Sequence, residues 1–82
     1  MIVINKDIDI NNWNGIKDIL PEITEINGNL ELSYMNLTEL PEIGHITIKG
    51  NFWCYNNKLT SFKNCPKIEG NFHCSNNLKA FS

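Results

Sequence analysis

The sequence predicts an α/β to mainly β fold, a small solenoid of about four short coils that share one parallel β-sheet. A motif seen most clearly at residues 50–62 recurs along the 82-residue chain, and its copies start near residues 6, 28, 50 and 70. Within each copy, apolar residues alternate with polar ones, and a glycine occupies the same slot in three of the four copies. A fixed period in the low twenties, with apolar residues at set offsets, is the signature of a short-coil solenoid.

The alternating apolar residues predict the strands. Side chains two residues apart point to the same face of an extended chain, so four isoleucines of the first copy share one face: Ile2, Ile4, Ile8 and Ile10. The same phase in the later copies predicts strands at residues 2–4 and 7–11, 24–33, 46–55 and 66–75. If these strands stack in chain order, Phe52 contacts Leu30 and Phe72 on the neighbouring coils.

The slot between the two apolar halves of each strand holds, in turn, Lys6, Gly28, Gly50 and Gly70. Glycine inside a strand marks a bend, or a place where neighbouring backbone comes close, because no Cβ stands in the way. We therefore expect the chain to bend at this slot. Lys6 breaks the pattern, and in an end coil its side chain can extend into solvent.

Each strand is followed by an asparagine-rich turn and a return segment. Asn57 and Asn77 hold a position from which stacked amides can satisfy backbone groups of adjacent turns. The first return segment has apolar residues at helical spacing, so a helix of about two turns is expected near residues 12–20, ending at Pro21. The later return segments are too short for more than a 3₁₀ turn.

Composition places the chain among small single-domain proteins, with one domain over residues 1–82. The formal charge of −2 argues against a nonspecific grip on nucleic acid, which needs clustered basic residues. No apolar run approaches the roughly 18–20 residues that cross a bilayer, and the N-terminus lacks the features of a signal peptide. Three cysteines without a disulfide framework suit a reducing compartment, so a cytoplasmic location is expected.

Residues 59–77 carry the most specific pattern: a Leu-Thr-Ser-Phe segment, a proline, and then Gly-Asn-Phe-His-Cys-Ser-Asn-Asn. This pattern resembles the leucine-rich-repeat-like short-coil arrays of bacterial and especially bacteriophage proteins, closely over about residues 24–82 and loosely over residues 1–23. The resemblance implies a parallel-sheet solenoid with a protein-binding role, and it implies no catalytic residues. With the small size and the Asn- and Ile-rich composition, it suggests a phage-encoded inhibitor of a host protein, such as a defence component, in the host cytoplasm.

The cysteines and histidines form no recognisable metal or catalytic motif. Four candidate ligands have the spacing C-x10-C-x7-H-C, without the closely paired cysteines of a structural zinc site: Cys54, Cys65, His73 and Cys74. Two of the thiols fall in the inward phase and the imidazole in the outward phase, so a Cys–His nucleophilic pair is not expected either. Asp9 and Glu31 share an open, solvated face that provides no cleft for acid–base chemistry. The sequence therefore predicts no enzyme activity, no cofactor and no metal site.

The outward columns of the predicted sheet carry the functional signal. Six residues are expected to form a partner-binding face, the first three at its centre and the others at its edge: Trp53, Tyr55, His73, Glu31, Ser33 and Tyr34. An exposed Trp–Tyr pair among small polar residues has the composition of an interaction hot spot. The alternative is that these aromatic residues only stabilise the sheet through cross-strand contacts. Trp13 is expected to pack in the core or as a cap instead.

The C-terminal end predicts a second contact region. The last copy has only 13 residues, so three apolar residues are expected to border an uncovered end: Phe72, Leu78 and Phe81. We expect this end to meet a partner or a second copy. The predicted function is thus a non-enzymatic protein–protein interaction module, with a structural module that self-associates through its open ends as the alternative. A small-ligand binder is disfavoured because four coils offer too flat a face for a deep pocket.

Overall fold

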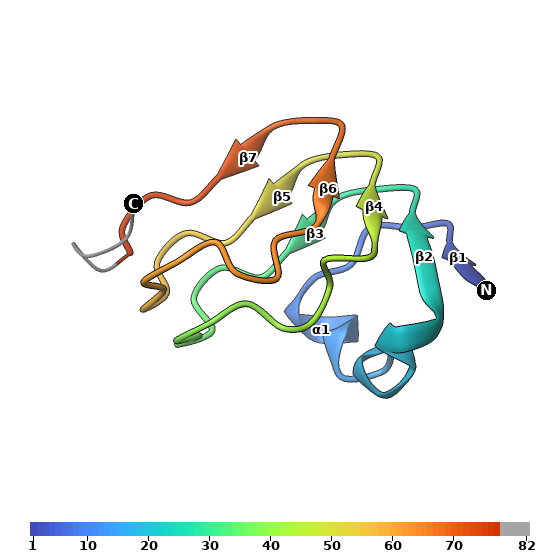
Figure 1. Cartoon of the computed structure of the whole chain (residues 1–82), viewed down its shortest axis with the longest axis horizontal. Helices are drawn as coiled ribbons and strands as arrows, with labels where there is room; N and C mark the ends of the chain where they lie inside the picture. Colours follow the sequence, from blue (N-terminus) through green and yellow to red (C-terminus); the bar gives the residue numbers. More distant parts are fainter. Residues whose placement is uncertain (78–82) are drawn as a thin grey trace.

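Two parallel sheets, built from seven short strands, dominate the computed structural model, which describes residues 1–77 of the chain (Figure 1). The architecture is a small, compact α/β type with few helices. Sheet A has the order β1-β2-β4-β6, and sheet B has the order β3-β5-β7. The strands of sheet A are Ile2–Ile4 (β1), Ile23–Ile26 (β2), Thr47–Ile48 (β4) and Lys67–Ile68 (β6). The strands of sheet B are Leu30–Glu31 (β3), Phe52–Trp53 (β5) and Phe72–His73 (β7).

Each of the later repeats contributes one short strand to each sheet, with a bend between the two strands. The prediction of a single sheet, with one bent strand from each repeat, is therefore wrong, although the bend lies at the predicted glycine slot: Gly28, Gly50 and Gly70. At the bend, the N–H of Gly50 donates to the carbonyl of Gly28, and the N–H of Gly70 donates to the carbonyl of Gly50, both at 3.0 Å. These hydrogen bonds keep backbone polar groups paired where the chain turns from one sheet to the other.

The strands stack in chain order and in a fixed register, as predicted. In sheet A, Ile26 pairs with Ile48. In sheet B, Phe52 pairs with Leu30 on one side and with Phe72 on the other. The rings of Phe52 and Phe72 are stacked, with centroids 5.6 Å apart. The apolar phase of the sequence therefore determines which side chains meet between repeats.

The inward side chains of both sheets form one continuous core with apolar residues of the return segments. Trp13 belongs to this core, as predicted. Each fully buried Leu, Ile or Phe stabilises the fold by roughly 1.5–3 kcal/mol relative to an exposed position. The buried apolar residues are Ile8, Trp13, Ile16, Leu20, Ile23, Ile26, Leu30, Leu32, Leu40, Ile43, Ile46, Ile48, Phe52, Cys54 and Leu59.

The first return segment folds differently from the prediction. Instead of one helix near residues 12–20, the structure has an α-helix at Ile10–Trp13 (α1) and a 3₁₀ helix at Lys17–Glu22 (η1). Pro21 lies inside η1 and does not end a helix. Figure 1 shows both helical segments at the lower edge of the molecule, with η1 leading directly into β2.

Asp9 explains why the predicted strand at residues 7–11 is also wrong. Its carboxylate accepts the N–H of Asn11 at 2.8 Å, and a capping box with Asn12 fixes the start of α1. Because the helix begins here, Ile10 leaves the inward phase and is 56% exposed. Only an isolated parallel bridge from Ile8 to β3 remains of the predicted strand.

Asn57 ties neighbouring turns together, as its position predicts. Its side-chain oxygen accepts the N–H groups of Met35 and Leu37, at 2.9 and 3.1 Å, and its amide group donates to carbonyls of both repeats. Asn77 repeats the arrangement one repeat later and accepts the N–H of Leu59 at 3.0 Å. The buried amide of Asn57 is therefore fully paired, which removes the cost of enclosing it.

A second ladder of polar side chains follows the bend, directly after the glycine slot. The side-chain oxygens of Asp7, Asn29 and Asn51 each accept the backbone N–H of the equivalent residue in the next repeat at 2.8 Å. The alternation of apolar and polar residues did not predict these hydrogen bonds. The ladder runs through Asp7, Asn29, Asn51 and Asn71.

We expect replacement of Gly50 by alanine to destabilise the fold strongly. A Cβ on Gly50 would lie 2.7 Å from the carbonyl oxygen of Gly28 and closer still to the side-chain oxygen of Asn29. No described glycine has a positive φ, so the cost comes from crowding against this backbone. The free energy of unfolding of Gly50→Ala in urea should fall by about 2–3 kcal/mol.

Gly44→Ala is the matched control for this measurement. A Cβ there would come no closer than 3.7 Å to its nearest neighbour, the carbonyl oxygen of Cys65. Its free energy of unfolding should stay within about 0.5 kcal/mol of the parent value. Equal effects of the two substitutions would contradict the role assigned to the bend.

Candidate functional site

Three outward side chains form a row across sheet B, one from each strand. The register places Trp53 of β5 between Glu31 of β3 and His73 of β7, as the sequence predicts. The rings of Trp53 and His73 are stacked, with centroids 6.1 Å apart and an angle of 17° between their planes. Trp53 is half-buried and His73 is exposed. Both point outward because their strand neighbours, Phe52 and Phe72, occupy the inward phase.

A second aromatic pair lies two residues further along the chain. The ring of Tyr55 meets the ring of Tyr34 edge to face, with centroids 5.6 Å apart. Tyr34 stands in the turn after β3 with a φ of 61°, in the left-handed region, and is 70% exposed. Its backbone N–H donates to the carbonyl of Tyr55 at 3.2 Å, which holds this turn against the next repeat.

Ser33 does not belong to the accessible surface, and its predicted place at the edge of the binding face needs correction. It is only 7% exposed, and its hydroxyl oxygen accepts the N–H of Tyr55 at 3.1 Å. Glu31 has a related role, because its Oε1 accepts the N–H of Ser33 at 3.1 Å. Ser33 therefore holds the backbone of Tyr55 in place beneath the predicted binding face, while the half-buried Glu31 remains at the edge of that face.

We refer to the remaining residues as the aromatic face: Trp53, Tyr55, His73 and Tyr34, with Glu31 at one edge. Aromatic side chains offer a large contact area for little loss of conformational entropy. Glu31 and His73 stand on opposite sides of Trp53, two strand spacings apart, which is roughly 10 Å. At that separation the carboxylate and the imidazole do not form an acid–base pair. Neither group is therefore placed to exchange a proton with the other across Trp53.

The structure also has a surface hollow that sequence reasoning missed. It measures about 380 Å³ and lies between two return segments, outside sheet B. Its lining contains two glutamates and one lysine but no histidine or cysteine. The lining residues are Leu37, Glu39, Leu40, Pro41, Glu42, Lys63 and Asn64.

The three thiols differ in exposure. Cys54 is fully buried, in the predicted inward phase, whereas Cys65 and Cys74 are half-buried. Burial, with smaller contributions from the neighbouring thiols and Glu31, raises the pKa of Cys54 to about 12. Burial also raises the pKa of Cys65 and of Cys74. Thiols kept neutral in this way are poor nucleophiles. Among residues 1–77, no three His, Cys, Asp or Glu side chains are grouped so that they could hold a metal ion.

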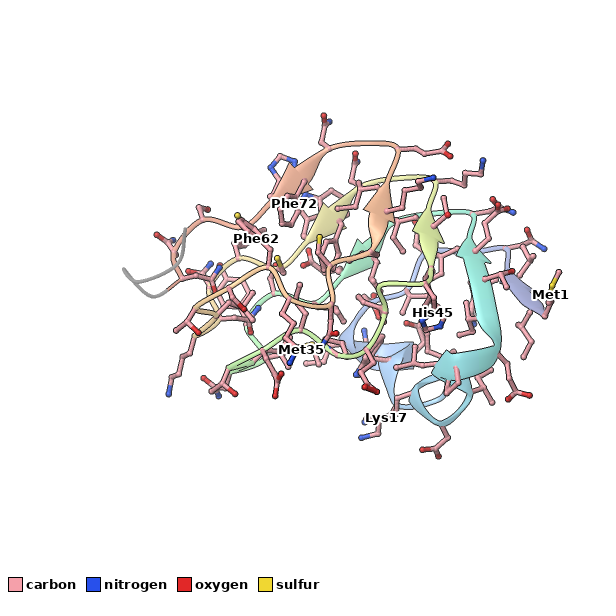
Figure 2. All side chains as sticks on the ribbon, viewed as in Figure 1. Met1, Lys17, Met35, His45, Phe62 and Phe72 are labelled. Carbon is pink, nitrogen blue, oxygen red and sulfur yellow. The ribbon has the colours of Figure 1, made fainter. Side chains whose placement is uncertain are left out.

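His45, the other histidine, serves the fold. Its Nε2 donates to the carbonyl of Leu20 in η1 at 2.7 Å, since a carbonyl oxygen can only accept. This hydrogen bond links the second repeat to the helical part of the first. Figure 2 shows His45 close to the helical segments and far from Phe72.

Phe72 marks the predicted contact region at the last described repeat. It is 37% exposed, although its register partner Phe52 is fully buried. Phe62 of the preceding return segment packs against it at an angle, with ring centroids 5.4 Å apart (Figure 2). Leu78 and Phe81, which were expected to complete this region, lie outside the described residues.

Comparison of the chain with models of protein families, with characterised proteins and with solved structures gave no significant match. The helical segments within residues 1–77 are too short and too polar to cross a membrane.

The buried thiol of Cys54 predicts a loss of stability at alkaline pH. Its pKa is about 12 in the folded protein, against an ordinary value of 9.0, so the unfolded chain loses the proton first. The contribution of the neutral Cys54 thiol to the free energy of unfolding is fully present below pH 9. From there toward pH 12 it declines by about 1.4 kcal/mol for each pH unit. Urea denaturation across this range should show a shallower decline for Cys54→Ala than for the parent protein. Equal slopes would contradict the assignment.

Proposed function

We propose that the chain is a small leucine-rich-repeat-like solenoid that acts as a non-enzymatic protein–protein interaction module. Parallel strands that stack in chain order support the solenoid, as do equivalent residues 20 or 22 positions apart in register. The paired amides of Asn57 and Asn77 support it as well, because they join consecutive turns in the same way. In this proposal the repeats act as a scaffold that presents the aromatic face.

The observation that carries the proposed function is the stacked pair of Trp53 and His73 beside the Tyr34–Tyr55 pair. Tyrosine and tryptophan are enriched among the residues that dominate binding energy at protein interfaces. A role in sheet stability alone would leave no reason for Tyr34 and His73 to stand in solvent, where large aromatic surface lowers solubility. The aromatic face therefore fits the centre of a contact with another protein.

We further propose a biological setting, in which the protein is a phage-encoded inhibitor of a host protein, such as a defence component, in the host cytoplasm. The resemblance of residues 24–82 to phage repeat arrays supports this setting. The small size of the chain also supports it, because an inhibitor can act by covering a surface and needs no catalytic site of its own.

The test is the substitution Trp53→Ala. The parent protein should capture its partner from extracts of the native host, and the purified pair can then be titrated by calorimetry. Loss of a central aromatic contact should weaken this complex by about 2–4 kcal/mol, or roughly 30- to 1000-fold in Kd. Because Trp53 points outward and leaves no core cavity, its free energy of unfolding should change by only about 1 kcal/mol or less.

Trp13→Ala is the matched control, with the same residue types exchanged in the core. It should lower the free energy of unfolding by about 3–5 kcal/mol, since Trp13 is buried. Normal partner binding by a folded Trp53→Ala protein would refute the proposed role of the aromatic face. Unfolding of Trp53→Ala would instead identify Trp53 as a structural residue.

Phe72 favours a second candidate function, an assembly module that self-associates through the last repeat. The exposed part of this ring lies beside the unpaired edges of β6 and β7 within the described residues. Two copies that met through this end would cover both rings in a symmetric contact. This contact could coexist with partner binding, because Phe72 has the inward phase whereas Trp53 and His73 of the aromatic face have the outward phase.

Sedimentation equilibrium tests this second candidate. The mean mass should rise as the concentration increases from about 10 μM to about 1 mM, because association follows mass action. Phe72→Lys, checked for folding by circular dichroism, should stay monomeric over the same range, since a charge would enter the contact. A strict monomer at every concentration of the parent protein would exclude self-association.

A further inference from the structure

The outer edges of β6 and β7 retain the hydrogen-bonding groups with which earlier repeats bind their successors. Within residues 1–77 no strand pairs with these edges, which lie at the end of both sheets (Figure 1). In the preceding repeat, the five equivalent groups all bind this last repeat, at 2.8–3.0 Å. Among the described residues, the groups left without such a partner are the carbonyls of Ile68 and Gly70, the side-chain oxygen of Asn71, and the N–H groups of Phe72 and Cys74.

The glycine slot restricts which strand can use these groups. A Cβ built on Gly28 or on Gly50 would lie 2.7 Å from the carbonyl oxygen of the slot residue before it, and one on Gly70 would lie closer still. Real Cβ atoms essentially never come within 3.0 Å of such an atom. A strand docked in the same register would stand over the Gly70 carbonyl in the same way, so its slot residue has to be glycine.

Charge adds a second requirement. Lys49, the residue before the slot glycine of its own repeat, reaches the carboxylate of Glu69 at 3.3 Å and that of Glu25 at 4.0 Å. The Glu69 side chain is 50% exposed, and no second described cation lies within salt-bridge distance of it. A basic residue before the slot glycine of an added strand would meet Glu69 from its open side.

The first repeat of a second copy does not meet these requirements. Its slot residue is Lys6, whose Cβ would collide with the carbonyl of Gly70. The acceptor that the N–H of Cys74 would need in that repeat is the carbonyl of Asp9, which already accepts two N–H groups of α1. Head-to-tail stacking of copies is therefore blocked.

We propose that the edges of β6 and β7 bind an extended segment of a partner protein, which adds as a parallel strand. The segment carries the pattern apolar–basic–glycine–any residue–apolar, so that its apolar residues cover Ile68 and Phe72 and its basic residue meets Glu69. This is recognition by strand addition, in which backbone hydrogen bonds give affinity and side-chain slots give specificity. The site adjoins the aromatic face at β7, which contributes His73 to that face, but it does not rest on the function proposed for the face.

The test uses the 82-residue protein and a synthetic peptide with the sequence of residues 46–57, with Cys54→Ser. This peptide contains the pattern as Ile-Lys-Gly-Asn-Phe. Titration of isotopically labelled protein, followed by NMR, should show saturable binding with a Kd of about 0.1–1 mM, because ordering a flexible peptide is costly. Hydrogen exchange at the N–H groups of Phe72 and Cys74 should slow on saturation.

Matched variants of the peptide and of the protein separate the two requirements. The peptide with Gly50→Ala should bind at least about tenfold more weakly, and the peptide with Lys49→Glu about threefold or more. In the protein, Asn71→Ala removes an open acceptor but keeps the N–H bond to Asn51, and should weaken binding about three- to tenfold. Lys17→Ala, in η1 and far from this edge (Figure 2), should bind the parent peptide normally.

Three outcomes would each overturn the proposal: no saturable binding of the parent peptide, equal binding of the peptide with Gly50→Ala, or spectral changes confined to the aromatic face. The outcome of Trp53→Ala with its own partner has no bearing on this result. The two proposals can therefore fail independently.

Discussion

The close contact between the backbones of successive repeats at the bend is the constraint on which the rest of the structure depends. Each bend places a carbonyl oxygen where the Cβ of the next slot residue would stand, so only glycine fits there. This contact fixes the register between repeats. The register then stacks Phe52 on Phe72 inside and Trp53 on His73 outside. The arrangement of the aromatic face and the packing of the core therefore both depend on this one close contact.

The sequence predicts much of this arrangement because the two-residue alternation continues through the bend. Phe52 and Cys54 are buried and His73 is exposed, in agreement with their phases. Repetition strengthens this prediction of inward and outward positions, because the position of an apolar residue in one repeat can be compared with the equivalent position in the next. The paired amide of Asn57 could be predicted for the same reason, because Asn77 stands at the equivalent position.

Local competition for hydrogen bonds explains what the sequence did not reveal. Asp9 caps a helix where the alternation predicts a strand, and Ile10 is turned outward as a result. Ser33 has an outward phase, but its hydroxyl accepts the N–H of Tyr55 and is covered. The division into two sheets follows from the bend, which the alternation alone does not show. The ladder at the bend did leave a signal, because an Asp or Asn follows the slot residue in every repeat.

Burial falls from the third repeat to the last described one, and this marks an end at which the stack can open. Phe52 and Cys54 are fully buried, whereas their counterparts Phe72 and Cys74 are not. In a stack where each repeat is stabilised by its neighbours, we expect the last described repeat to separate before the middle repeats do. A molecule that occupied that end would protect the amides of all the repeats behind it. Binding at this end would then lower the frequency of unfolding at the other end through the folding equilibrium alone, without any change in the folded structure.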